Sequence, residues 1–421
     1  MKNHPNLGDR DREVNPSVQQ FIRDLQDGNW RKRQAAAQAL GNIGPQAAEA
    51  VPNLSQALQD EDSHVRWAAA QALGNIGAQA LEAVPDLNHA LQDPKWYVRK
   101  AAAQALGNIG PQAAESVSTL SQTLQDEELS VRWAAAQALG NIGAQAAEAV
   151  PTLSQALKDR EGIVRWAAAQ ALGNIGPQAA DAVLPLGHAL QDPKWYVRKT
   201  AAQALESIGP QAAEAVPELV QTLKDSDEDV REAAAWTLAQ IGKPAIPELI
   251  RALEDSDKNV RKSAAWVLGK IGPQATKAIT LLIQALQDEE LSVRWEAAKA
   301  LGKISSQTAE AVPVLIHALK NWDEDVREAA GEALAQIGKP AVSDLIHTLK
   351  DSDEDARRIS VEALGKIGPQ AAAAVPALIQ ALKDWDEDVR EAAVEALAKI
   401  GEPAVPELIH TLKDSDEDAR R

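Results

Sequence analysis

The chain has 421 residues, no cysteine and a formal net charge of −18 at pH 7. Without cysteine it forms neither disulfides nor cysteine-based metal centres, and its negative charge repels the phosphates of nucleic acid. Its apolar residues are mainly Ala, Leu, Ile and Val, with only 3% aromatic residues. This composition is typical of closely packed helices and argues against nucleic acid as a partner.

Residues 1–15 are polar and charged, and we expect them to form a disordered tail. They contain no apolar segment of the kind found in signal peptides, and no later apolar run is long enough to span a membrane. The sequence therefore predicts a cytoplasmic protein that does not use a membrane as a partner.

From residue 16 onward, a pattern that ends in isoleucine recurs along the chain. We call these residues the anchor isoleucines: Ile43, Ile76, Ile109, Ile142, Ile175, Ile208, Ile241, Ile271, Ile304, Ile337, Ile367 and Ile400. The step from one anchor to the next is constant, except that it is shorter from Ile241 to Ile271 and from Ile337 to Ile367. A helical repeat with this period indicates a solenoid, in which each unit buries its apolar face against its neighbours. We therefore expect residues 16–421 to form one continuous solenoid.

Residues 44–77 show how one unit is built. Val51, Leu54 and Leu58 form an apolar stripe at helical spacing, which predicts a first helix. The acidic turn that follows supplies capping residues for a second helix, and Gly77 can end that helix in a left-handed conformation. Each unit is therefore predicted to be a pair of helices.

Most second helices carry V-R near their start, after an aspartate in the preceding turn, and half of all second helices end in A-L-G-x-I-G. This pattern resembles the HEAT-like repeats that are grouped with phycobilisome lyases, and the resemblance covers residues 16–421. It implies an all-α, right-handed α-solenoid of about twelve two-helix repeats, with the last repeat incomplete. It also implies that the second helices line the concave surface. A designed consensus array would have similar units, but the mixed steps favour natural duplication.

An arginine lies ten residues before every anchor, and an aspartate lies sixteen residues before every anchor except Ile337, where Asn321 replaces it. In the families that the chain resembles, such residues hydrogen-bond between neighbouring turns, and buried charges need such partners. The resemblance therefore implies a structural ladder, which includes Arg66, Arg99, Arg132, Arg165, Arg198, Asp60, Asp93, Asp126, Asp159 and Asp192.

The residues 13, 9 and 5 positions before each anchor point away from the core of the second helix, and we call this surface the tryptophan face. Nine of the eleven tryptophans occupy it. The predicted binding residues include eight of them: Trp67, Trp96, Trp133, Trp166, Trp195, Trp236, Trp266 and Trp295. Two interpretations remain open, because these rings either contact a ligand or cover neighbouring alanines between repeats.

Amide side chains add to the predicted binding set in three units. They form the rows Trp67, Gln71 and Asn75; Trp133, Gln137 and Asn141; and Trp166, Gln170 and Asn174. Such a row offers donors and acceptors to an extended peptide backbone, although glutamine is also an ordinary helix-surface residue. Beyond Ile304 the same face becomes acidic, which favours a basic partner segment.

No catalytic motif, metal-ligand set or cofactor fingerprint is present, so we expect no catalytic residues, no metal and no cofactor. The sequence favours a non-catalytic scaffold that binds a protein or extended peptide on its concave face. The alternative, implied by the resemblance, is a phycobilisome-related bilin lyase or a phycobilisome-degradation adapter subunit. The chain stops before the second helix of its last repeat, which suggests a truncated product or end-to-end self-association.

Overall fold

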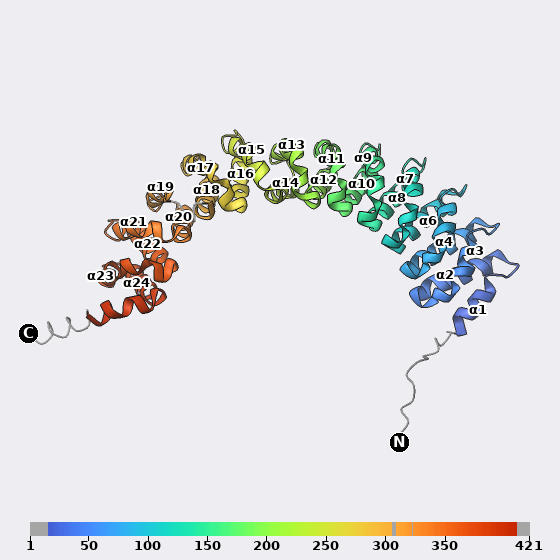
Figure 1. The fold of residues 1–421 in the computed structure, drawn as a ribbon, viewed down its shortest axis with the longest axis horizontal. Coiled ribbons are helices and arrows are strands. Elements are labelled where there is room, and N and C mark those ends of the chain that lie inside the picture. Colours follow the sequence, from blue (N-terminus) through green and yellow to red (C-terminus); the bar gives the residue numbers. More distant parts are fainter. Residues whose placement is uncertain (1–15, 305–308, 322, 411–421) are drawn as a thin grey trace, which may run out of the picture. The chain divides into compact units, whose positions relative to one another are not determined.

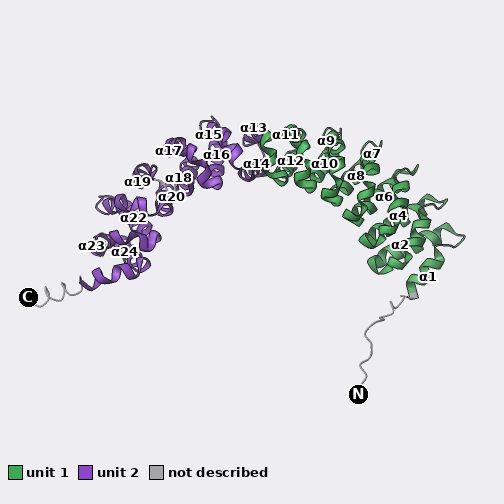
Figure 2. Cartoon of the chain, viewed as in Figure 1, with its two compact units in different colours: residues 1–215 green, residues 216–421 purple. Residues whose placement is uncertain are grey.

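The computed structural model describes residues 16–304, 309–321 and 323–410. The expected tail at 1–15 and the end of the incomplete last repeat lie outside these residues. Every regular element of the described segments is a helix, which confirms the predicted all-α solenoid of about twelve repeats. The chain divides into two compact units, residues 1–215 and 216–421, shown in Figure 2. The continuity of the solenoid from one unit to the next stays a prediction.

The second helices all have the same length and end at the anchor isoleucines. They are α2 (Trp30–Ile43), α4 (Ser63–Ile76), α6 (Trp96–Ile109), α8 (Leu129–Ile142), α10 (Gly162–Ile175), α12 (Trp195–Ile208), α14 (Glu228–Ile241), α16 (Lys258–Ile271), α18 (Leu291–Ile304), α20 (Glu324–Ile337), α22 (Glu354–Ile367) and α24 (Glu387–Ile400).

The first helices are shorter than the second helices. They are α1 (Pro16–Asp24), α3 (Val51–Ala57), α5 (Val84–Ala90), α7 (Val117–Thr123), α9 (Val150–Ala156), α11 (Val183–Ala189), α13 (Val216–Thr222), α15 (Ile246–Ala252), α17 (Ile279–Ala285), α19 (Val312–Ala318), α21 (Val342–Thr348) and α23 (Val375–Ala381).

A 3-10 segment joins most second helices to the next first helix. The longer segments are η1 (Gly44–Ala50), η2 (Gly77–Ala83), η3 (Gly110–Ser116), η4 (Gly143–Ala149), η5 (Gly176–Ala182), η6 (Gly209–Ala215), η8 (Gly272–Ala278) and η10 (Gly368–Ala374). The shorter segments are η7 (Lys243–Ala245), η9 (Lys339–Ala341) and η11 (Glu402–Ala404). Because η7 and η9 lie in the two shorter steps between anchors, the shortening of those steps lies in this connection.

Within each unit the helices form two layers, as Figure 1 shows. Successive second helices, such as α4, α6 and α8, pack side by side in one layer, and each first helix packs against the second helix of its own repeat. Leu54 of α3 and Leu73 of α4 have no exposed surface, so the core lies between the layers. Ala68 and Ala70 of α4 are also fully buried, because a second helix has neighbours on both sides.

Small residues let neighbouring second helices approach closely. A Cβ atom added to Gly107 of α6 would lie 2.9 Å from Cα of Ala138 in α8. At the end of α4, Gly77 has a φ of 69°, which glycine adopts without strain and which stops the helix as predicted. At its start, the side chain of Asp62 accepts a hydrogen bond from the backbone N–H of His64. No helix among the described residues is long and apolar enough to cross a membrane.

Candidate binding surface

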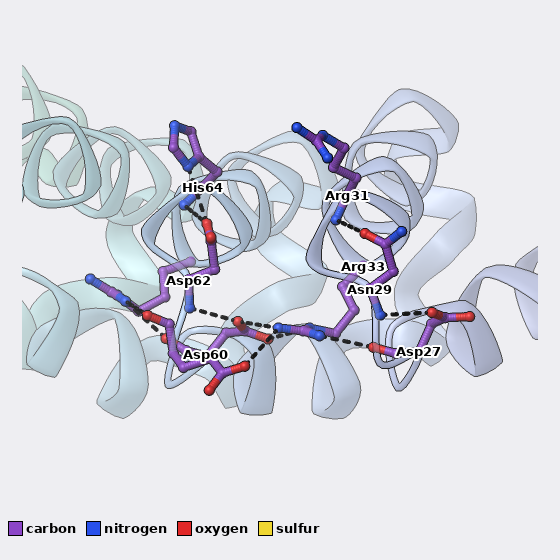
Figure 3. Close-up of polar contacts among 9 residues, drawn as sticks. Asp27, Asn29, Arg31, Arg33, Asp60, Asp62 and His64 are labelled. Carbon is purple, nitrogen blue, oxygen red and sulfur yellow. Dashed lines mark hydrogen bonds and ion pairs between the residues drawn. The ribbon is translucent and has the colours of Figure 1, made fainter.

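Buried ion pairs link successive repeats at their inter-helix turns, as Figure 3 shows for the first of them. Arg33 donates from Nε and Nη2 to the carboxylate of Asp60 at 2.6 and 2.8 Å, and from Nη1 to the carbonyl of Asp27 at 2.9 Å. Equivalent bidentate pairs are Arg66–Asp93, Arg99–Asp126, Arg132–Asp159, Arg165–Asp192, Arg261–Asp288 and Arg357–Asp384. These side chains are therefore engaged inside the fold. Arg198 donates to the carbonyl of Asp192 at 3.0 Å.

The aspartates that follow the shorter connections η7 and η9 have different partners. Asp255 pairs with Lys224, with 3.0 Å between Oδ2 and Nζ, and Asp351 pairs with Lys320. Arg327 instead contacts Asp355 at 2.9 Å. Shortening of the connection thus coincides with a change from arginine to lysine as the partner of the aspartate.

The tryptophans of residues 1–215 fall into two groups by exposure. Trp30, Trp67, Trp133 and Trp166 are half-buried, whereas Trp96 and Trp195 are 43% and 48% exposed. Nε1 of Trp133 is buried and has no hydrogen-bond acceptor among the described residues, while the ammonium of Lys100 lies 6.0 Å from the ring centre. The half-buried rings therefore pack against the protein and still present one side to the surface.

A cavity of 390 Å³ brings several predicted binding residues together between α4 and α6. Its lining residues are His64, Trp67, Gln71, Trp96, Tyr97, Lys100, Ala101 and Gln104. His64 also stacks between Trp30 and Tyr97, with ring centres 5.4 and 6.1 Å away. His64 and Tyr97 were not among the predicted binding residues, because each lies one position beside the tryptophan face.

The amide rows end close to neighbouring helices. Gln71, Asn75, Gln170, Asn141 and Asn174 are exposed, and Gln137 is half-buried. At the same repeat position as Asn75, Asn108 donates from Nδ2 to the carbonyl of Gly74 at 3.2 Å. An asparagine at this position can therefore bind the preceding helix, and peptide binding by the rows stays a prediction.

In residues 216–421 the tryptophan face has a pair of indole rings in contact. Trp236 and Trp266 form an edge-to-face pair with ring centres 4.9 Å apart, and Nζ of Lys270 lies 4.9 and 5.3 Å from the two centres. They line a cavity of 360 Å³ between α14 and α16, together with Glu228, Arg231, Glu232, Ala235, Asn259, Lys262, Ser263 and Glu296. Trp295 does not line this cavity, and Nζ of Lys299 is 3.8 Å from its ring centre.

Glu296 is the buried charge of this cavity. It is only 6% exposed, and no hydrogen bond or ion pair joins its side chain to a described residue. Burial raises the pKa of Glu296, and the positive charges of Lys299, Lys262, Lys303 and Lys270 oppose this effect. Glu296 was not among the predicted binding residues, although a glutamate at a repeat position that is usually alanine is a visible signal.

An acidic cavity of 440 Å³ follows along the same face. It is lined by Trp295, Asp325, Glu328, Ala329, Gly331, Glu332, Ile359, Glu362, Ala363 and Lys366. Glu362 pairs with Arg358 at 2.8 Å, whereas Glu328 is exposed and has no ion pair with a described residue. Three glutamates of the predicted acidic stretch, Glu328, Glu332 and Glu362, thus lie around one tryptophan, whereas Glu391 and Glu395 do not line this cavity.

Comparison with known families identifies the repeat. A family model described as HEAT repeats matches residues 18–94, 117–185, 150–220, 183–250, 216–290, 246–335 and 342–421. The chain belongs to the HEAT repeat family. A second HEAT repeat model matches residues 83–113, and a model described as PBS lyase HEAT-like repeat matches residues 326–351. These matches confirm the resemblance inferred from the sequence. No curated protein matches the chain.

Solved structures with this HEAT repeat fold include karyopherins. The karyopherin Kap121p bound to the extreme C-terminus of the protein phosphatase Cdc14p is 15% identical, with a TM-score of 0.62 over 95% of this chain and 52% of that one. Importin beta is 17% identical, with a TM-score of 0.60 over 93% of this chain and 66% of that one. An engineered protein is 25% identical, with a TM-score of 0.47 over 92% of this chain and 99% of that one. The chain spans about half the length of Kap121p, and the karyopherin likeness shows the fold.

Proposed function

We propose that this chain is a non-catalytic scaffold that binds an extended basic segment of another protein along its tryptophan face. The observation that carries the proposal is that each cavity described above on this face contains at least one of its tryptophans. Partly exposed indoles beside polar groups are the side chains that contribute most to protein recognition. Tryptophans that served only to fill the core would not need to line cavities at the surface.

The spacing of the repeats suits an extended chain. Neighbouring packed helices lie about 8–10 Å apart, and an extended peptide advances about 3.3 Å per residue. About three residues of a bound segment would therefore cover one repeat. Glutamine and asparagine amides at the same positions in successive repeats would meet peptide groups at a regular interval.

The charge of the face favours a basic segment. Asp325, Glu328, Glu332 and Glu362 surround the cavity next to Trp295, where Lys366 is the cationic lining residue. Carboxylates in this arrangement attract Lys and Arg side chains and speed their association at low salt. Kap121p has been solved with the extreme C-terminus of another protein bound, which supports a protein segment as the ligand.

A bilin lyase or adapter subunit is the second candidate, because the PBS lyase HEAT-like repeat model matches residues 326–351. A bilin needs free cations for its propionates beside aromatic rings. At Trp96 and Tyr97, the neighbouring Arg99 is already bound to Asp126 at 2.7 Å, which leaves Lys100 as the single Lys or Arg side chain that lines this cavity. The binding role is therefore better supported, and a change in visible absorbance on mixing with a bilin would favour the second candidate.

The proposal is tested with a fluorescent, unstructured, Lys- and Arg-rich peptide, and with an acidic peptide of equal length, titrated with the full chain while anisotropy is measured. We expect binding of the basic peptide only, weakening as salt rises, and a loss of affinity of about tenfold in the double variant Glu328→Gln, Glu332→Gln. The matched control Glu254→Gln, Glu402→Gln removes two exposed carboxylates outside the tryptophan face. Equal loss in both double variants would contradict the proposal.

A further inference from the structure

We propose that the cavity between α14 and α16 binds the guanidinium group of an arginine side chain, held between the indole rings of Trp236 and Trp266 and the carboxylate of Glu296. This inference rests on the proposed function, because the arginine would belong to the bound segment. It predicts that an arginine of the bound segment occupies this cavity on the tryptophan face.

Glu296 lacks the partner that a buried carboxylate requires. Most repeats have alanine at this position, eight residues before the anchor, as at Ala68 and Ala101. Glu296 is 6% exposed and lines the cavity, yet it accepts no hydrogen bond from a described residue. Burying a carboxylate without a direct partner is costly, and the four lysine charges around Glu296 offset this cost only in part, because its pKa is still raised. A cation that enters the cavity would offset the remaining cost.

The indole pair provides the second half of the site. The ring of Trp236 is 43% exposed, and the rings of Trp236 and Trp266 meet edge to face. Lys270 already places an ammonium group near both rings, so the indole pair accommodates a cation beside it. The 360 Å³ cavity leaves room for a second, planar cation beside the indoles.

The planar shape of the guanidinium group favours it over ammonium at this cavity. Lys262 lines the cavity, and Lys299 and Lys303 lie close enough to affect the ionisation of Glu296. They repel any guest cation, so a simple point charge gains little there. A guanidinium group also stacks on indole and donates two parallel hydrogen bonds to a carboxylate, which an ammonium group cannot do. Glu228 and Glu232, at the same cavity, partly offset the repulsion.

The test follows the indole N–H signals of the full-length chain by NMR, with Trp236→Phe and Trp266→Phe used for assignment. The probes are acetyl-Gly-Arg-Gly-amide, its lysine counterpart and its uncharged citrulline counterpart. We expect the arginine probe to shift the signals of Trp236 and Trp266 more than the other probes do, and more than it shifts the signals of Trp67 and Trp96. Glu296→Gln should reduce the apparent affinity at least about tenfold, roughly the worth of one hydrogen bond to a charged group.

A control and a second variant complete the test. Glu254→Gln, outside the cavity, should leave the arginine response unchanged, and Lys262→Gln should strengthen it because one repelling charge is removed. Equal responses to arginine and citrulline, or an unchanged response in Glu296→Gln, would overturn the inference. If the long basic peptide binds but these signals do not respond, the arginine site fails and the scaffold function stands. If the tripeptide responds but no long peptide binds, the site stands and the scaffold function fails.

Discussion

Arg99 in α6 holds the carboxylate of Asp126 with two hydrogen bonds, from Nε to Oδ2 at 2.7 Å and from Nη2 to Oδ1 at 2.8 Å. Both side chains are 11% exposed. The hydrogen bond with Asp126 raises the pKa of Arg99 further above its ordinary value, so the arginine stays charged. Because Asp126 belongs to the next repeat, this contact joins two units of the solenoid.

Arg99→Lys should therefore weaken the fold while keeping the charge. Lysine cannot form the bidentate contact, and we expect the free energy of unfolding in urea to fall by about 1–2 kcal/mol. Lys399→Gln removes an exposed pair with Glu395 and should cost no more than about 0.5 kcal/mol. Equal effects of the two substitutions would mean that the ladder does not stabilise the repeats.

Gly107→Ala tests the close approach of second helices. The new Cβ would lie 2.9 Å from Cα of Ala138, and a backbone atom cannot move aside cheaply. We expect a loss of about 1–3 kcal/mol from overpacking, which exceeds the gain of about 1 kcal/mol from helix propensity. Gly28→Ala is the control, since no atom lies within 4 Å of its added Cβ. Thermal unfolding of both variants checks the prediction, and a more stable Gly107→Ala protein would refute it.

Substitutions of Trp133 and Trp96 distinguish a ring that stabilises the fold from a ring that is available to a ligand. Trp133→Ala should lower the free energy of unfolding by about 2 kcal/mol, less than the roughly 3–5 kcal/mol typical of a fully buried tryptophan. Trp133→Phe should cost much less, because the buried Nε1 has no acceptor to lose. Trp96→Ala, at a ring that is 43% exposed, should change stability by no more than about 0.5 kcal/mol. Equal destabilisation by both alanine substitutions would contradict this prediction, because it would mean that both rings stabilise the fold to the same extent.

Glu296 predicts a pH-dependent effect on stability. Burial raises its pKa above the ordinary value of 4.5, although Lys299, Lys262, Lys303 and Lys270 oppose the shift. A group with a raised pKa in the folded state contributes its relative stabilisation below pH 4.5, and that contribution is lost as pH rises through the folded-state pKa. Glu296→Gln should therefore unfold at a higher temperature than the unchanged chain at neutral pH. The difference should vanish below pH 4.5, and a difference of constant size would contradict this account.

The repeat pattern predicted the ends of the second helices because the same physical requirement recurs in every unit. Ile76 must be buried and Gly77 must take a positive φ, so the two residues mark where α4 ends. The binding residues were harder to predict. Trp67, Gln71 and Trp96 line one cavity, but a helical wheel does not show how far a ring such as Trp133 turns toward its neighbour.

Other features depend on how two repeats meet, which spacing within one repeat cannot show. Residues Gly44–Ala50 form the 3-10 segment η1 because they connect two packed helices. Their sequence alone is also compatible with an irregular turn. Glu296 becomes a site residue only because Trp236 and Trp266, from two preceding repeats, lie at the same cavity. The change of partner at Asp255 depends in the same way on the shorter connection.

The most direct test of the central claim is to map where a basic peptide lies on the chain. A Lys- and Arg-rich peptide with a benzophenone side chain at its centre is bound, photolysed and located by mass spectrometry. The scaffold account predicts cross-links to second helices at the tryptophan face, such as α18 and α20, and none with an acidic peptide. Cross-links concentrated in the first helices α17, α19 and α21, or spread equally over both layers, would contradict it.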